Sequence, residues 1–403
     1  MREWQRMVLF GAVGLLALWP ADRALAVSVS GQSSTMLEWN NDAEEDTAVP
    51  VYEYLRLNVS DIDGSGLNFR FYGRLADDLA NEVDADSRLY FAYLEKKNAL
   101  PHLDFKLGRQ FITTTGGASI MDGLSLQYRD LGPFTLTAFG GGDIGYYKGY
   151  DVKDLIDGIR LSGHFLDGLD ASVSYLQKWE ESELTHELFG LDLGYDYRDR
   201  LGLYGEWQFN YLANSLSYFN GGINLHWQPK WSLRLDYLYS LPVFSSTSIY
   251  SVFAVSEYQE ASAEFSYNHG EGVRSFCRYA REMYEEVADA NVVEIGVEKI
   301  RTDRFSGYLS GVWRDDPDGQ DLYGVKVRSA FRFNSLLQAG IGAEIDVLDR
   351  RLEVEDETTS SRIWADATAY FSRKVNVEAK IERGESDLWD YFFRGRVRLN
   401  ILF

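Results

Sequence analysis

The sequence is poor in the residues that build cofactor and metal sites. It has one cysteine, Cys277, among 403 residues. One cysteine excludes an internal disulfide, covalent haem attachment through a C-x-x-C-H motif and a cysteine-cluster metal site. The five histidines form no i, i+2 or i, i+4 pair and lie in no recognisable pattern with Ser, Asp or Glu. We therefore expect neither a cofactor nor an enzymatic activity.

Basic charge, proline and long apolar runs are also scarce. Lys and Arg total 40 against 62 Asp and Glu, which gives a formal charge of −22. A nucleic-acid partner would need a basic surface, so we expect none. After residue 26, no run approaches the 18 apolar residues of a membrane helix. Only seven prolines occur and 15% of the residues are aromatic, which is typical of strand-rich proteins, soluble or membrane-embedded.

The first residues have the pattern of a secretory signal. Arg2 and Arg6 give a positive start, residues 7–19 are apolar and uncharged, and Ala24-Leu25-Ala26 is a small-x-small cleavage site. The apolar run is too short to cross a bilayer as an anchor. We therefore predict a signal peptide over 1–26 and a mature chain over 27–403.

Apolar residues of the mature chain recur mostly at every second position, as in β-strands. In 201–211, for example, Leu203, Trp207 and Phe209 alternate with Glu206, Gln208 and Asn210. About 22 such segments occur, and most have the 9–11 residues of a tilted membrane strand. The predicted strands are 27–39, 51–60, 67–75, 88–96, 103–112, 124–129, 134–139, 158–165, 169–177, 187–197, 201–211, 217–227, 231–240, 257–267, 273–282, 292–300, 305–313, 322–332, 336–346, 361–371, 375–382 and 391–403.

The predicted connections alternate between short and long. Short ones such as 198–200 and 228–230 are basic, whereas long ones such as 40–50 and 347–360 are rich in acidic residues. Short turns at one end and longer loops at the other are the arrangement of outer-membrane barrels. An even strand number places both termini at the short-turn end. The glycine clusters 116–117 and 140–142 are predicted to be turns or flexible rims, because no nucleotide-binding motif follows them.

The last predicted strand carries arginine on one face and apolar residues on the other. Arg394, Arg396 and Arg398 alternate with apolar residues, and the chain ends on Phe403. This ending resembles the assembly signal of bacterial outer-membrane barrels. The resemblance implies an outer-membrane location, contact with lipid and lipopolysaccharide, and recognition of the last strand by the barrel assembly machinery.

Physical constraints favour a closed barrel over the alternative, a soluble β-sandwich with a polar outer face. Three arginines in one strand cannot face a dry core without partners. A cation facing lipid at the bilayer midplane costs about 2–4 kcal/mol. An open sheet edge cannot lie in hydrocarbon. We therefore predict an all-β fold, a single antiparallel transmembrane β-barrel of about 20–22 strands without a plug domain, whose arginines point into a wet lumen.

The same alternation predicts which side chains line the lumen. Together they would make it hydrophilic, whereas for any single one of them structural solvation of the wall is the simpler explanation. The predicted pore-lining residues are Arg56, Arg70, Arg74, Arg160, Glu206, Arg234, Asp236, Glu264, Glu294, Glu298, Lys326, Arg328, Arg332, Glu344, Arg362, Asp366, Glu378, Lys380, Arg394, Arg396 and Arg398.

Two functions fit this outline. Barrels of about 22 strands enclose a lumen that is usually plugged. We predict neither a domain before the first strand nor a loop long enough to fill the lumen, which argues against a plugged transporter and favours a porin-like channel. A large unplugged barrel without a cofactor motif is also similar to the barrel component of porin–cytochrome conduits, and that resemblance implies a multihaem cytochrome as partner. Some conduit barrels carry a cysteine pair near the mature N-terminus, which this sequence lacks.

Overall fold

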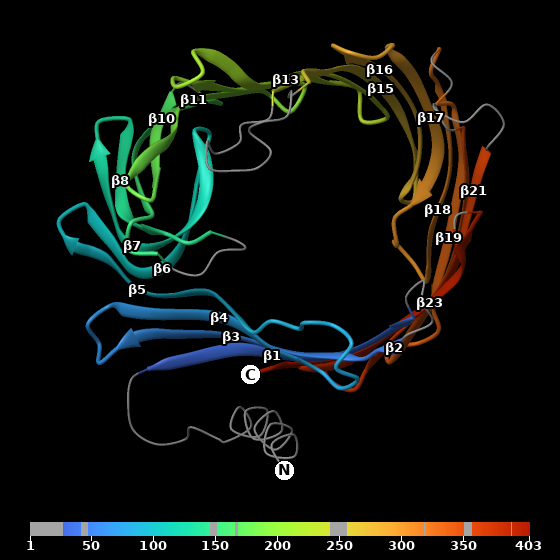
Figure 1. Cartoon of the computed structure of the whole chain (residues 1–403), viewed down its shortest axis with the longest axis horizontal. Helices are drawn as coiled ribbons and strands as arrows, with labels where there is room; N and C mark the ends of the chain where they lie inside the picture. The colour runs from blue at the N-terminus through green and yellow to red at the C-terminus, as the bar shows by residue number, and fades with distance from the viewer. Residues whose placement is uncertain are drawn as a thin grey trace. The chain divides into compact units, whose positions relative to one another are not determined.

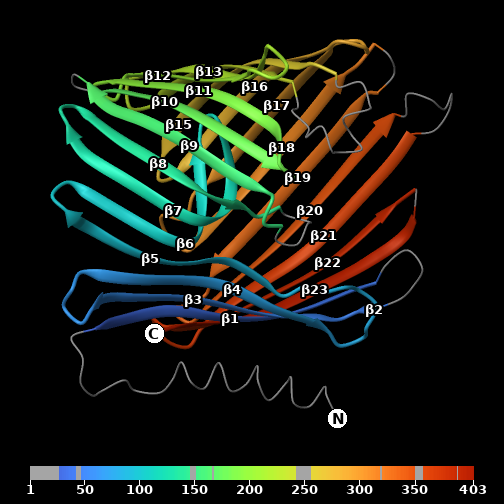
Figure 2. The ribbon, with the colours of Figure 1, turned by 60° about the vertical axis from the view of Figure 1, so that its left-hand side comes forward.

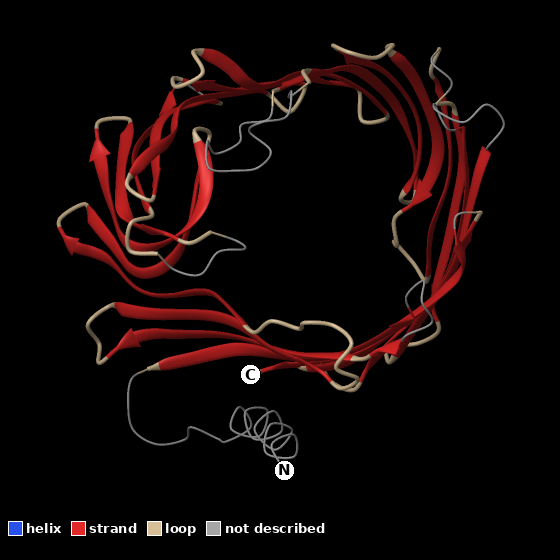
Figure 3. Cartoon of the chain, viewed as in Figure 1, coloured by secondary structure: helices blue, strands red, loops and turns tan. Residues whose placement is uncertain are grey.

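The computed structural model describes residues 27–41, 47–145, 151–165, 168–241, 256–317, 320–349, 357–387 and 389–403. The predicted signal peptide, 1–26, lies outside these residues. All regular secondary structure in the described part of the chain is β-strand, as Figure 3 shows. None of the described residues belongs to a helix that is long and apolar enough to cross a membrane.

The described residues form 23 strands, and all but the two-residue β2 are at least ten residues long. They are β1 (Ser28–Asn41), β2 (Thr47–Ala48), β3 (Pro50–Ile62), β4 (Leu67–Asp78), β5 (Arg88–Leu100), β6 (Leu103–Thr114), β7 (Gly117–Leu131), β8 (Phe134–Asp143), β9 (Leu155–Phe165), β10 (Leu169–Glu180), β11 (Glu183–Tyr197), β12 (Leu201–Asn210), β13 (Ser215–Trp227), β14 (Trp231–Ser240), β15 (Tyr258–Gly270), β16 (Val273–Tyr284), β17 (Ala290–Lys299), β18 (Phe305–Asp315), β19 (Leu322–Arg332), β20 (Leu337–Asp349), β21 (Glu357–Tyr370), β22 (Val375–Ser386) and β23 (Trp389–Leu402).

The strands belong to one sheet, in which the first and last strands meet. β1 pairs antiparallel with β3 on one side and with β23 on the other, so that Met36 lies opposite both Tyr52 and Arg398. Figures 1 and 2 show β23, β1, β3 and β4 side by side, and the paired strands β9 to β11 likewise. Because the first strand pairs with the last, the fold is a single closed antiparallel β-barrel of 22 long strands, as predicted.

Each long strand overlaps one predicted strand, but the connections do not alternate as regularly as expected. The predicted long loop over 140–157 is shorter, because β8 continues to Asp143 and β9 begins at Leu155. The chain between β6 and β7 is only two residues long, because β7 begins at Gly117 instead of residue 124. The segment 117–123 is rich in small residues, so its alternation is weak in the sequence.

Aromatic rings cover glycines where β23 meets β1. A Cβ atom on Gly31 would lie 2.4 Å from the ring of Phe403, and a Cβ atom on Gly395 would lie 1.9 Å from the indole of Trp39. The backbones of Gly31 and Phe403 exchange two hydrogen bonds of 3.1 Å each. Phe403 therefore stabilises the pairing of β1 and β23, which closes the sheet.

Substituting Gly395→Val should destabilise this pairing, because the new side chain would overlap the Trp39 indole. We expect a loss of about 1–3 kcal/mol from overpacking, seen as a lower temperature at which the folded band disappears in heat-modifiability gels. Gly194→Val on β11 is the matched control, since a Cβ atom there meets nothing within 4 Å. An equal loss of stability in both variants would contradict a specific role for the Trp39–Gly395 contact.

The strands fall into two compact units. Met1–Lys97, Ala330–Ala343 and Ser361–Phe403 form one, here called the terminal unit, and Asn98–Ser329 and Glu344–Ser360 form the other, the central unit. In both units the sheet has two chemically distinct faces. The face that carries Arg234 or Arg398 is called the polar face, and the opposite one the apolar face.

The apolar face exposes large aliphatic and aromatic side chains along the strands. Ile295 on β17 is 58% exposed, for instance, and the residues opposite it in the register, Cys277 and Gly311, carry no charge. Other exposed members of this face are Leu193, Leu203, Ile223, Leu235, Phe265, Leu309, Val325, Ile341, Ile363, Ile381 and Val397. Such a large exposed apolar surface is unfavourable in water.

Candidate functional site

The polar face of the central unit is crossed by ion pairs between neighbouring strands. Arg274 bridges Glu264 on β15 and Glu298 on β17, and Arg314 lies 2.9 Å from Glu282. Nearly every basic side chain here has an acidic partner, so that charges of both signs are balanced locally. The predicted pore-lining residues on this face of the central unit are Arg160, Glu206, Arg234, Asp236, Glu264, Glu294, Glu298, Lys326, Arg328 and Glu344.

The remaining predicted pore-lining residues share the polar face as well. The register of β22 and β23 places Arg398, Arg396 and Arg394 opposite Glu378, Lys380 and Glu382. Residues two apart on a strand share a face. Arg56, Arg70 and Arg74 share this face through the register of β3 and β4. Arg362 and Lys380 both lie against the Trp364 ring. Arg332 and Asp366 are placed on this face by alternation along β19 and β21. All 21 predicted residues thus lie on the polar side of their strands, while their exposure to a lumen stays a prediction.

Several partners of these side chains were not predicted from the sequence. Arg274, Arg278 and Arg314 lie on the polar face and hold Glu264, Glu260 and Glu282. Their positions alternate with apolar residues in the same way as the predicted ones, so the signal was present in the sequence. Asp192 was missed too, and Arg160 lies 3.8 Å from it.

The hairpin of β6 and β7 folds over the polar face of β10, β11 and β12. The Gly116 amide donates a hydrogen bond of 2.9 Å to Ser174, and the Thr115 hydroxyl donates one of 2.9 Å to Asp192. The Gln208 side-chain amide donates to the Gly116 carbonyl oxygen at 3.1 Å. At Gly190 a Cβ atom would lie 2.2 Å from the Gly116 nitrogen. The hairpin tip therefore lies flat on these strands, inside the curve that Figure 1 shows for them.

A small apolar core lies beneath this folded hairpin. Its members are Ile112, Met121, Phe139, Ile156, Leu176 and Leu188. Met121 and Leu176 have no exposed surface. All of them belong to the polar face by register, where apolar side chains are otherwise few. Burying one such side chain contributes about 1.5–3 kcal/mol to the folding free energy. This core therefore stabilises the folded position of the hairpin.

Glycines make the bend possible. A Cβ atom on Gly123 would lie 2.2 Å from the Gly140 carbonyl oxygen, and one on Gly141 would lie 2.4 Å from the Asp122 carbonyl oxygen. The prediction that 140–142 form a turn or flexible rim is therefore wrong, because these residues belong to β8 and pair with β7. Their lack of side chains lets two strongly curved strands approach closely.

The other side of the hairpin carries an ion pair. Arg109 on β6 and Asp122 on β7 face each other across the register and make two contacts, of 2.8 Å and 2.7 Å. Phe111, two residues further along the same side, is 53% exposed. The folded hairpin thus presents a charged pair and an aromatic ring on the side away from β10 to β12.

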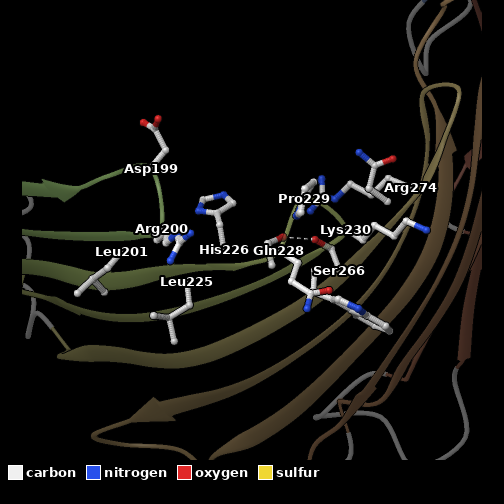
Figure 4. A pocket seen from close by; sticks show the side chains of 13 residues that line it. Asp199, Arg200, Leu201, Leu225, His226, Gln228, Pro229, Lys230, Ser266 and Arg274 are labelled. Carbon is white, nitrogen blue, oxygen red and sulfur yellow. Dashed lines mark hydrogen bonds between the residues drawn. The ribbon is translucent and has the colours of Figure 1, made fainter.

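A pocket of roughly 950 Å³ lies at the short-turn end of the central unit. Figure 4 shows its lining, to which the connections after β11 and β13 contribute Arg200 and Lys230, with His226 between them. Ser232 and Ser266 share a hydrogen bond of 2.5 Å at its base. Basic groups outnumber acidic ones in this lining, in agreement with the predicted basic character of the short turns.

Comparison with known proteins supports the fold. No protein-family model matches the sequence, and no curated protein matches it either. The P pilus usher (PapC) translocation pore resembles this structure with a TM-score of 0.53 and 10% identity, over 93% of this chain and 99% of that one. Pseudomonas aeruginosa OccK5 (OpdH) and OpdQ give TM-scores of 0.44 and 0.42, with 11% and 10% identity, over 94% of this chain and 98% and 99% of theirs. At such identities the likeness to the usher pore concerns the fold alone, a large β-barrel.

Proposed function

We propose that the chain lies in the bacterial outer membrane and forms a porin-like channel with a polar lumen. The observation that carries this proposal is the separation of the two faces of a closed sheet. Aliphatic side chains such as Ile295 and Leu309 are exposed on one face, and ion pairs such as Arg314–Glu282 cover the other. Lipid suits the first surface, and only water suits the second. The usher pore, which is similar in fold, is a translocation pore, and this agrees with a passage through the barrel.

In this proposal the apolar face and the polar face have different surroundings. Lipid and lipopolysaccharide surround the apolar face, and the 21 predicted polar residues line the passage. The barrel assembly machinery recognises the last strand, whose terminal Phe403 packs against Gly31.

The folded hairpin narrows this passage. It leaves the line of the neighbouring strands and is held at Ser174, Asp192 and Gln208 on the polar face. Its outer side carries the Arg109–Asp122 pair, and a charged pair is better solvated by water in a lumen than by lipid. We assign it the role of a constriction that limits the size of the solutes that pass.

Conductance of the purified, refolded barrel in a planar bilayer tests the proposal. We expect steady, weakly ion-selective channels, because positive and negative side chains alternate on the polar face. A folded barrel that inserts without conducting would overturn it. A multihaem cytochrome that stays bound during purification from the native membrane, detected by its Soret absorbance, would favour the conduit function instead.

A further inference from the structure

Tyrosine rings form a continuous row on the polar face of the terminal unit. The ring centroids of Tyr52 and Tyr54 are 6.2 Å apart, those of Tyr54 and Tyr72 are 6.4 Å apart, and those of Tyr72 and Tyr90 are 4.8 Å apart. The row crosses β3, β4 and β5, and its last two pairs are stacked with interplanar angles of 22° and 20°. None of the four side chains is fully buried. The row therefore offers accessible aromatic surface.

Arginines accompany this row on both sides. The guanidinium carbon of Arg74 lies 5.2 Å from the centre of the Tyr52 ring, and that of Arg398 lies 5.8 Å from the centre of the Tyr54 ring. Such stacking against an aromatic face fixes the guanidinium plane and leaves the N–H groups at its edge able to donate. One of them, Nη2 of Arg74, donates to the Asp86 carbonyl oxygen at 2.7 Å. The row and its arginines, here called the Tyr–Arg row, are contributed by β3, β4, β5 and β23.

The arginines of the Tyr–Arg row are less neutralised than those of the central unit. In the described part of the chain, Arg74 and Arg398 form no ion pair, whereas Arg274 alone has two. The Nε atoms of Arg74 and Arg398 are buried without a hydrogen-bond partner. A buried donor without a partner is costly.

On the polar face of the central unit, Tyr204, Arg234 and Asp236 form a self-contained triad, in which the arginine and the carboxylate neutralise each other. The Tyr204 hydroxyl donates to Asp236, Arg234 donates to the same carboxylate at 2.7 Å, and the guanidinium lies 6.0 Å from the centre of the Tyr204 ring. Each charge in this triad has its counter-charge. The Tyr–Arg row has the same kinds of side chain. Glu378 lies opposite Arg398 in the register of β22 and β23, but among the described residues no carboxylate forms an ion pair with Arg74 or Arg398.

We propose that the Tyr–Arg row binds solutes that combine a carboxylate with a ring, such as a uronic acid, on their way through the channel. The carboxylate takes the place that Asp236 has in the triad and accepts hydrogen bonds from the arginine edges. The ring lies with its C–H face against the tyrosine rings. The inference rests on the proposed function in that the polar face must be reached from the lumen.

Calorimetric titration of the refolded barrel in detergent with galacturonate, galactose and propionate tests the site without relying on conductance. Galacturonate supplies both groups, galactose only the ring and propionate only the carboxylate. We expect galacturonate to bind at least about tenfold more tightly than either of the others. Galactose lacks the carboxylate, and one good charge-assisted hydrogen bond is worth about that factor. Propionate lacks the ring and therefore buries less apolar surface against the tyrosines. Equal affinity for propionate or galactose, or no heat with any of the three, would overturn the site.

Variants separate binding from folding. Arg74→Gln and Tyr72→Leu should each weaken galacturonate binding about tenfold, while Arg234→Gln, in the self-contained triad, should leave it unchanged. Heat-modifiability gels verify that each variant is folded. Equal weakening by Arg234→Gln would contradict a local site. If the barrel binds galacturonate but does not conduct, the channel function is refuted and the binding site stands. If it conducts but does not bind galacturonate, only the binding site is refuted.

Discussion

Removing the folded hairpin should raise the single-channel conductance by roughly twofold or more, because the lumen of a barrel this size is wide once nothing narrows it. The variant deletes residues 111–120 and joins Gln110 to Met121 through an Asn-Gly turn, which suits a two-residue hairpin. These two residues are already opposite each other in the register of β6 and β7. Planar-bilayer recordings of the deletion variant and the full chain give the comparison.

A point substitution tests the same claim with the hairpin present. Gly190→Leu places a side chain where the Gly116 nitrogen now lies, so that the tip cannot rest on β11. We expect noisy openings to higher conductance levels, because the apolar core beneath the hairpin still attracts it. Unchanged conductance in both variants, with folded barrels verified by gel mobility, would show that the hairpin does not narrow the passage.

Placing a positive charge on the apolar face should cost about 2–4 kcal/mol of folding free energy in a bilayer. Leu309 lies near the middle of β18, is 49% exposed and belongs to the apolar face. Leu309→Arg therefore puts a cation where we place the hydrocarbon core. Urea unfolding of the barrel in phospholipid vesicles measures the change.

The neighbouring residue supplies the control. Ser310 belongs to the polar face, opposite Gly296, so Ser310→Arg adds the same charge beside acidic side chains of β17. We expect a change below about 1 kcal/mol there, as for solvated charges. If Ser310→Arg were the more damaging of the two, the assignment of faces to lipid and water would be reversed.

The strands were predictable because their chemistry has a local period. The alternation of Glu206 and Gln208 with Trp207 and Phe209 fixes strand and face at once. The charge pattern at Arg394, Arg396 and Arg398 gave the polar face of the last strand in the same way. No knowledge of distant contacts was needed for either inference.

The folded hairpin was not predictable from such a pattern. Its contacts join Thr115 and Gly116 to Ser174, Asp192 and Gln208, which are 58 to 93 residues away in the sequence. Small residues over 117–123 hide the alternation of β7. Only the register shows that Met121 and Leu176 share a face and bury each other.

The Tyr–Arg row depends on an irregularity as well. The register between β4 and β5 shifts after Tyr72, which places Tyr72 opposite Phe91 and leaves Tyr90 free to stack on it. A β-bulge of this kind re-aims a side chain without a clear sequence signal. The tyrosines were visible in the sequence, but their row was not.

Thiol accessibility tests most directly whether the polar face borders water inside the membrane. In a Cys277→Ser background, Ser262→Cys and Ala263→Cys place single thiols on adjacent residues of β15, on the polar and the apolar face. We expect a charged thiol reagent to lower the conductance of the Ser262→Cys channel and to leave that of the Ala263→Cys channel unchanged. Modification of Ala263→Cys alone, or of neither thiol in a conducting barrel, would contradict it.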